Sequence, residues 1–188
     1  ALAILARAYH FDAVETGGLL RFAPLVRPVV ATIPYDALLR NGGDAAPLEV
    51  TRGPELDLPR EIAVRYIDPA RDYQPGVQRA RRQLTPSVVS SDYELPLTLS
   101  AERAKQAAEI ELGRQWLERE GASFALPVRY ARLAPGDVIA ISGFGKPLGL
   151  MISEIEYGGG RLACRARAYA ADVFASGAEA EAGTVPPQ

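Results

Sequence analysis

The chain has 188 residues, of which 48% are hydrophobic and 23% are charged, and its formal net charge is -2. This length suits one domain or two small ones and buries enough surface to need no stabilising disulfide or metal. The slightly acidic balance argues against a general polyanion binder. The single cysteine, Cys164, excludes an internal disulfide framework and a zinc site built from cysteines.

Two features bear on the protein's surroundings. Arginine, aspartate or proline interrupts the apolar runs well before the roughly 20 residues that a membrane helix needs, so we expect no membrane span. The chain begins at Ala1 and its only methionine is Met151, so we expect it to be a piece of a larger polypeptide.

The first part of the chain predicts a helix end followed by short strands. Residues 1–9 have apolar side chains at near-helical spacing, and we expect them to end a helix that belongs to a preceding region. Strands are predicted at 10–14 and 19–23, joined by a glycine turn, and at 27–33. One helical turn is predicted at 35–40. Residues 42–59 are rich in proline and glycine and are expected to form a loop insertion.

Residues 60–97 are expected to form a protruding strand pair. Alternating apolar and polar side chains over 61–67 predict a half-buried strand. The segments 77–84 and 87–94 are expected to pair antiparallel across Thr85 and Pro86. Both are polar on two faces, which is typical of an edge, a protruding ribbon, or a surface that faces a channel or a partner.

One long helix organises the chain. Ser100 is expected to cap its first turn, and Gly121 is expected to end it in a left-handed conformation. One stripe of this helix consists mostly of alanine, which allows close packing on a sheet, and the stripe comprises Ala101, Ala104, Ala108, Leu112 and Trp116. Ile110 and Leu117 lie on roughly the opposite side. We expect these two residues to be partly exposed until a further surface of an assembly covers them.

The last part of the chain predicts three antiparallel strands and a tail. Strands at 137–142, 148–157 and 161–169 are separated by short glycine-containing links, which favour a meander. Residues 176–188 are small, polar and proline-terminated, so we expect a linker. Together the elements predict an α+β, strand-dominated fold with barrel-like, mostly antiparallel packing and one long helix on its side.

Few residues point to catalysis. His10 is the only histidine, and no partner spacing supports a histidine-dependent hydrolase. Glu154 and Glu156 would share one face of a strand, about 7 Å apart along it, which fits a pair of glycosidase carboxylates. Acids that alternate with apolar residues are also what the solvent face of any amphipathic strand shows. We therefore expect no catalytic, cofactor or metal site, and a carbohydrate-active domain remains the alternative.

One basic cluster is present, at Arg79, Arg81 and Arg82. Such a cluster can contact nucleic acid, or it can belong to a solvated or subunit-facing edge strand. The acidic balance elsewhere in the chain favours the second interpretation. We expect the three arginines, together with Ile110 and Leu117, to face an interface or a channel.

Four segments resemble one protein family in their order and spacing. They are FDAVETGGLLRFAP, EIAVRYIDPARDYQPGVQRARR, AERAKQAAEIELGRQW and LPVRYARLAPGDVIAIS. Together they are similar to the tail-hub region of the large tail-tip proteins of siphophages and gene transfer agents, over about residues 9–174. In those proteins the region follows a glycoside-hydrolase-like barrel, to which the hydrolase-like activity belongs.

The resemblance implies a structural role. It implies that residues 10–175 form a tail-hub β-barrel related to tail-tube proteins, that the protein is a homotrimer, and that it closes the tail tube and carries the host-contacting tip. Distal tail and hub proteins are the implied partners, and the resemblance allows non-specific contact with DNA in the tail channel. The implied location is the tail tip of a phage or gene transfer agent particle assembled in the bacterial cytoplasm. The family supplies no catalytic residues for this region.

Overall fold

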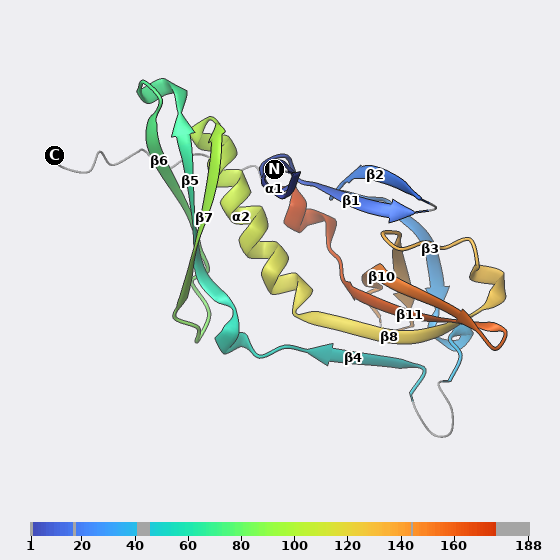
Figure 1. Cartoon of the computed structure of the whole chain (residues 1–188). Helices are drawn as coiled ribbons and strands as arrows, with labels where there is room; N and C mark the ends of the chain where they lie inside the picture. The colour runs from blue at the N-terminus through green and yellow to red at the C-terminus, as the bar shows by residue number, and fades with distance from the viewer. Residues whose placement is uncertain (1, 17, 41–45, 144, 176–188) are drawn as a thin grey trace. The chain divides into compact units, whose positions relative to one another are not determined.

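A computed structural model describes residues 2–16, 18–40, 46–143 and 145–175 (Figure 1). The helices and strands, in chain order, are α1 (Leu2–Tyr9), β1 (Phe11–Thr16), β2 (Leu19–Pro24), β3 (Val29–Pro34), β4 (Leu48–Arg52), β5 (Pro59–Asp68), β6 (Gln74–Arg81), β7 (Val89–Thr98), α2 (Ala101–Glu118), β8 (Glu120–Pro127), β9 (Val138–Ser142), β10 (Leu148–Gly158) and β11 (Arg161–Ala168). Short 3-10 turns connect several of them.

The described residues fall into two compact units that are interleaved along the chain. The first comprises the described residues within 1–12, 54–116 and 172–188, and the second comprises those within 13–53 and 117–171. The predicted tail-hub domain covers 10–175 as one stretch. Compact units inside the chain do not test where a domain begins and ends in a longer protein, so those outer limits stay a prediction.

The first unit contains a three-stranded sheet in the order β6-β5-β7 (Figure 1). The central strand, β5, runs antiparallel to β6 and parallel to β7. Alternate residues of β5, Ile62, Val64 and Tyr66, are buried in a core shared with α2. The prediction that 77–84 pairs with 87–94 is wrong, because β5 lies between the two strands and satisfies a backbone edge of each.

Helix α2 supplies the other half of this core. The backbone N–H of Arg103 donates to Ser100 Oγ at 3.3 Å, which confirms the predicted N-cap. Within the alanine stripe, Ala104, Ala108, Leu112 and Trp116 are buried and Ala101 is partly buried against the same core. The indole Nε1 of Trp116 donates to the carbonyl of Pro59 at 2.8 Å, so the large residue of the stripe also anchors the start of β5.

The prediction that Gly121 ends α2 in a left-handed conformation is wrong. The helix ends at Glu118, and Gly121 is a residue of β8, paired with Thr51 on one side and Arg167 on the other. An added Cβ at Gly121 would lie 2.9 Å from Thr51 Oγ1, so a larger residue there would require the Thr51 side chain to shift. Strand β8 was not predicted, because the sequence Gly121 to Leu126 is rich in small residues and lacks a clear alternation.

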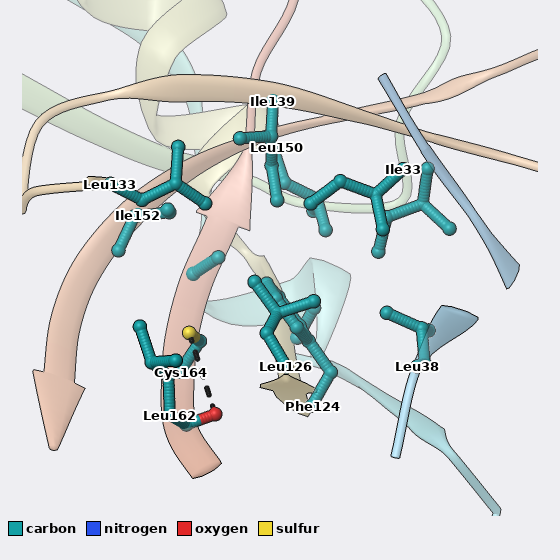
Figure 2. Packing of buried hydrophobic residues seen from close by; sticks show 13 residues of the cluster. Ile33, Leu38, Phe124, Leu126, Leu133, Ile139, Leu150, Ile152, Leu162 and Cys164 are labelled. Carbon is teal, nitrogen blue, oxygen red and sulfur yellow. Dashed lines mark hydrogen bonds between the residues drawn. The ribbon is translucent and has the colours of Figure 1, made fainter. Parts of the chain in front are cut away.

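The second unit contains a two-stranded sheet, β1-β2, and a six-stranded sheet in the order β3-β9-β10-β11-β8-β4. The predicted hairpin at the start of the chain and the predicted meander of β9, β10 and β11 are confirmed. Figure 2 shows the core of this unit, in which residues of several strands meet. Its fully buried members include Ile33, Phe124, Leu126, Ile139 and Leu162.

The structure corrects the expected barrel. The fold is α+β with one long helix, as predicted, but in the described residues the six-stranded sheet is open, with β3 and β4 at its two edges. It is also mixed rather than antiparallel, because β3 runs parallel to β9. Closing a sheet requires its two edge strands to pair. Pro34 offers no N–H for such pairing, and a register shift between Val29 and Ala31 bends the same strand.

Three further expectations concern the less regular parts of the chain. Residues 2–9 form α1, as expected, and its origin in a preceding region stays a prediction. The expected loop at 42–59 is wrong in part, because β4 lies within it and pairs antiparallel with β8. Residues 42–45 of that loop and the expected linker at 176–188 lie outside the described residues.

Candidate functional site

The outer face of the three-stranded sheet carries alternating charges. Strand register places Glu61 beside Arg81, Ala63 between Arg79 and Asp92, and Arg65 beside Glu94. Because side chains alternate along a strand, all of these residues lie on the face opposite the buried Ile62 and Val64. We call this surface the charged face and define it by Glu61, Arg65, Arg79, Arg81, Asp92 and Glu94.

Ion pairs link the three strands across the charged face. Arg81 Nε donates to Glu61 Oε2 at 2.6 Å, and Arg79 Nε lies 3.4 Å from Glu61 Oε1. Arg65 lies 3.8 Å from Asp92. The arginine side chains are more than half exposed, whereas that of Glu61 is only 18% exposed. Exposed pairs of this kind contribute about 0.2–1 kcal/mol each, so their main effect is to fix which charges the surface presents.

The charged face is balanced rather than basic. It presents three arginines and three carboxylates, so a polyanion that approaches the arginines also meets Glu61, Asp92 and Glu94. Two of the predicted site residues, Arg79 and Arg81, lie here and share one carboxylate. Their shared partner on β5, Glu61, was missed, although the alternation of charged and apolar residues in 61–65 is a usable signal.

The third predicted arginine has a different environment. The guanidinium of Arg82 lies over the ring of Trp116, 4.2 Å from its centroid, and its backbone N–H donates to the carbonyl of Arg60 at 2.8 Å. A guanidinium stacked on an indole gains a cation–π interaction and shields the ring from water. Arg82 therefore covers the end of the first core rather than joining the charged face.

The two predicted helix residues differ from each other. Ile110 is only 4% exposed, so the expectation that it stays partly exposed in the chain alone is wrong. Helix α2 is buried over more of its circumference than the alanine stripe, since Ala107, Ile110 and Glu111 are also buried. Leu117 is half-buried, as expected. A role for either residue at an interface stays a prediction.

The alternative catalytic pair lies on an open surface. Glu154 and Glu156 are exposed on β10, and Glu154 is paired with Arg165 at 3.1 Å. They border a shallow hollow of about 210 Å³ that is also lined by Ser123 and Ala163. Burial raises the pKa of the adjacent Cys164 thiol to about 11, so this cysteine stays protonated and is no nucleophile at neutral pH. Nothing in this arrangement encloses a sugar ring.

His10 occupies a strained and partly buried position. Its backbone φ is 54°, and among the described residues its Nε2 atom is buried without a hydrogen-bond partner. Burial lowers the pKa of His10, Arg103 lowers it further, and Glu111 partly opposes them. These are the surroundings of a neutral structural histidine at the start of β1, with no nucleophile to activate.

Buried polar groups in the first unit are engaged by neighbours. Lys105 Nζ donates to the carbonyl of Arg79 at 2.6 Å, which ties α2 to β6. Burial would raise the pKa of Glu111, but hydrogen bonds and charge from Arg114 outweigh it, so the pKa lies below its ordinary value. Gln115 donates both to Glu111 at 2.9 Å and to the hydroxyl of Tyr93 at 2.6 Å. These contacts hold the helix on the sheet.

A metal centre and a membrane span are two further features that would bear on function. The described stretches of the chain contain no group of three or more histidine, cysteine, aspartate or glutamate side chains placed to hold a metal ion. Of the helices described, none is both long and apolar enough to span a membrane.

Solved structures of tail proteins share this fold. A chain in the structure "Virion of native gene transfer agent (GTA) particle" matches 96% of this chain with a TM-score of 0.83 and 23% identity. A tail protein from Neisseria meningitidis MC58 matches 86% of this chain with a TM-score of 0.58 and 13% sequence identity. The 43 kDa tail protein of prophage MuSo2 from Shewanella oneidensis matches 92% of this chain with a TM-score of 0.58 and 14% sequence identity. This chain spans 41%, 52% and 54% of those three chains, respectively.

A comparison with curated proteins found no match. The sequence itself matches one family model, described as "Putative phage tail protein", over residues 1–155. That match covers most of the chain, and the shared fold agrees with it. The chain belongs to the phage tail protein family.

Proposed function

We propose that this chain is a structural part of the hub at the tip of a phage or gene transfer agent tail, where three copies close the tail tube and carry the host-contacting tip. The observation that carries the proposal is the match to a gene transfer agent virion chain over 96% of this chain with a TM-score of 0.83. The family match over residues 1–155 supports the tail assignment independently. In this role the chain works by assembly with distal tail and hub proteins.

The surface chemistry supports assembly more than catalysis. The carboxylates Glu154 and Glu156 lie on an open face, and the charged face is held by cross-strand ion pairs. In a hub around a channel, a balanced charged surface would let DNA pass without holding it. We therefore assign the charged face to weak contact with DNA or to a subunit interface.

Labelled particles test the hub role. The experiment is electron microscopy of particles in which the protein that contains this chain bears an affinity tag, with gold-labelled antibody as the readout. We expect label at the end of the tail. A tagged distal tail protein serves as a position marker, and label along the tube or on the head would contradict the hub role.

Removing Glu61 tests whether this carboxylate limits the affinity of the charged face for DNA. Glu61→Gln leaves Arg79 and Arg81 without their shared carboxylate, so we expect affinity for an oligonucleotide to rise about threefold at low salt and the gain to vanish at high salt. Glu120→Gln, which also breaks one arginine pair but lies on β8, is the control. Tight, sequence-selective binding by the wild-type chain would favour a nucleic-acid-binding function instead.

A further inference from the structure

The hairpin of β1 and β2 exposes apolar side chains on both of its faces. Successive residues of a strand point to opposite faces, yet Leu19, Leu20 and Phe22 are between 53% and 65% exposed. A two-stranded ribbon is marginally stable alone, and apolar side chains in water on both faces add a further cost. Among the described residues, β1 and β2 have only each other as strand neighbours. The hairpin therefore has an apolar surface, and no third strand of the described residues is paired with it.

The apolar surface continues into the segment that follows. Val26, Val29 and Val30 are also about half exposed, and Val26 and Val30 line a hollow of about 350 Å³ together with Arg21. Side chains of this number and exposure leave on the order of 500 Å² of apolar surface in water, the upper end of what monomeric proteins show. An area of this size would form most of one side of a stable interface, which needs about 800 Å².

The same unit carries a matching strand edge. Strand β4 ends the six-stranded sheet, pairs with β8 without a register shift and contains no proline, so its outer edge is not blocked. The opposite edge, β3, is blocked by Pro34 and by the register shift beside Val30. Val50 of β4 is 51% exposed at the side of the sheet where its neighbour Ala122 joins the core.

The side-chain patterns of β2 and β4 are complementary. On β4, Leu48 and Val50 point to the core side and Glu49 to the outer side. On β2, Leu20 and Phe22 share one face and Arg21 lies on the other. If β2 extended the sheet beyond β4, its apolar pair would cover Leu48 and Val50, and Arg21 would come beside Glu49.

We propose that the β1–β2 hairpin is an arm that binds a second copy of this chain, with β2 adding to the free edge of that copy's β4. The inference rests on the proposed function, in which copies of the chain assemble with one another. The hairpin and the β4 edge are different surfaces of the chain, so the contact is head-to-tail, and such contacts close into rings when the rotation permits.

Charge exchange at the contact provides the test. Arg21→Glu and Glu49→Arg each turn the expected attraction into repulsion, so each variant alone should weaken self-association roughly tenfold or more, as measured by analytical ultracentrifugation over a concentration series. The double variant should recover wild-type association. Arg161→Glu, an exposed charge reversal on β11, is the control and should change nothing.

Mixing the two single variants makes the test sharper. In the mixture the hairpin of each variant is opposite in charge to the β4 edge of the other variant, so the mixture should regain association in alternating order, whereas each variant alone should stay weakly associated. A cysteine pair at positions 21 and 49 should also cross-link copies of the wild-type background, because Cys164 is buried and does not compete. A cysteine pair at 161 and 49 is the cross-linking control.

The outcomes separate this inference from the proposed function. A wild-type chain that stays monomeric, two reversals without effect, or a cysteine pair that cross-links no better than its control would overturn the hairpin contact. Binding of the hairpin to a different tail protein instead of a second copy would also overturn it. Tagged particles with label at the tail tip would leave the hub role intact in each of these cases.

Discussion

His10 lies where α1 gives way to β1, in a left-handed backbone conformation and with its ring partly buried. Among non-glycine residues, only short polar side chains and histidine adopt such a conformation with any frequency. Burial and the positive charge of Arg103 both disfavour the protonated ring, and Glu111 only partly offsets them. The protonation state of His10, at the start of β1, therefore makes the stability of the fold depend on pH.

We predict a stability change with pH that depends on His10. Its pKa lies below the ordinary value of 6.5 in the folded chain, so the unfolded chain binds the proton more tightly. The contribution of His10 to stability is complete above about pH 6.5 and is lost as the pH falls toward the folded pKa. Urea unfolding between pH 5 and 7.5 measures this loss, and His10→Asn, which tolerates the same backbone angle, should flatten the curve. If the stability of the His10→Asn variant falls with pH as steeply as that of the wild type, His10 is not the group responsible.

Gly149 is required because a backbone carbonyl lies against it. A Cβ at this position would lie 2.5 Å from the carbonyl oxygen of Tyr169, whose N–H also donates to the carbonyl of Gly149 at 2.9 Å. Backbone atoms on both sides cannot move apart without breaking that hydrogen bond.

We predict that Gly149→Ala lowers the free energy of unfolding by about 1–3 kcal/mol, the usual cost of forcing an extra methyl group into a packed site. Gly158→Ala on the same strand is the matched control, since an added Cβ there meets nothing within 4 Å and its effect should be near zero. Chemical denaturation of the two variants measures the difference, and equal values would show that the strand end shifts freely.

At the scale of elements, α2 lies close to its sheet because its contact residues are small. Ala104 and Ala108 have no exposed surface, and Lys105 reaches from the same helix to the carbonyl of Arg79. Small side chains let helix and sheet backbones approach closely, and the lysine hydrogen bond adds a polar link between them. The alanines therefore set the distance, and Trp116 fixes the far end.

We predict that Ala108→Leu destabilises the chain by about 1–3 kcal/mol, because the added side chain pushes α2 away from β5. Ala101→Leu, at the partly buried first turn, is the control and should cost less than half as much. Thermal unfolding followed by circular dichroism checks the comparison. A stabilised Ala108→Leu variant would mean that a cavity lies under the helix.

At the scale of the whole molecule, the chain passes between its two compact units at several points. Helix α2 begins in the first unit, and its last residues, Leu117 and Glu118, are assigned to the second, where β8 starts two residues later. Neither unit is a continuous segment of the sequence. When one unit folds, it therefore fixes the positions at which segments of the other unit begin and end.

We predict that the two units unfold together. Trp116 is the only tryptophan and lies in the first unit, so its fluorescence reports on that unit. Ile139→Ala creates a cavity in the core of the second unit and should lower the free energy of unfolding by about 2–4 kcal/mol. It should also lower the unfolding midpoint reported by Trp116 fluorescence. Val128→Ala, at an exposed position, is the control. If Ile139→Ala leaves the midpoint reported by Trp116 fluorescence unchanged, the two units unfold independently.

The sequence by itself determined the local elements. Ser100 at the helix start, the alternation in β5 and the glycine links between β9, β10 and β11 are short-range signals, because each depends on residues within one or two turns or on a single strand. The four segments that resemble the tail-tip family also led to the correct family. These signals gave the long helix, the first hairpin and the meander.

Only the tertiary structure decided which strands are neighbours and which surfaces remain exposed. Strand β5 inserts between β6 and β7, and β3 joins β9 in parallel, because long-range pairing depends on which backbone edges and apolar faces find partners. The same pairing placed Glu61 within reach of both Arg79 and Arg81, and in the described residues it left β2 and β4 at the edges of their sheets. Local patterns fix which face of a strand is apolar, but they do not specify what covers it.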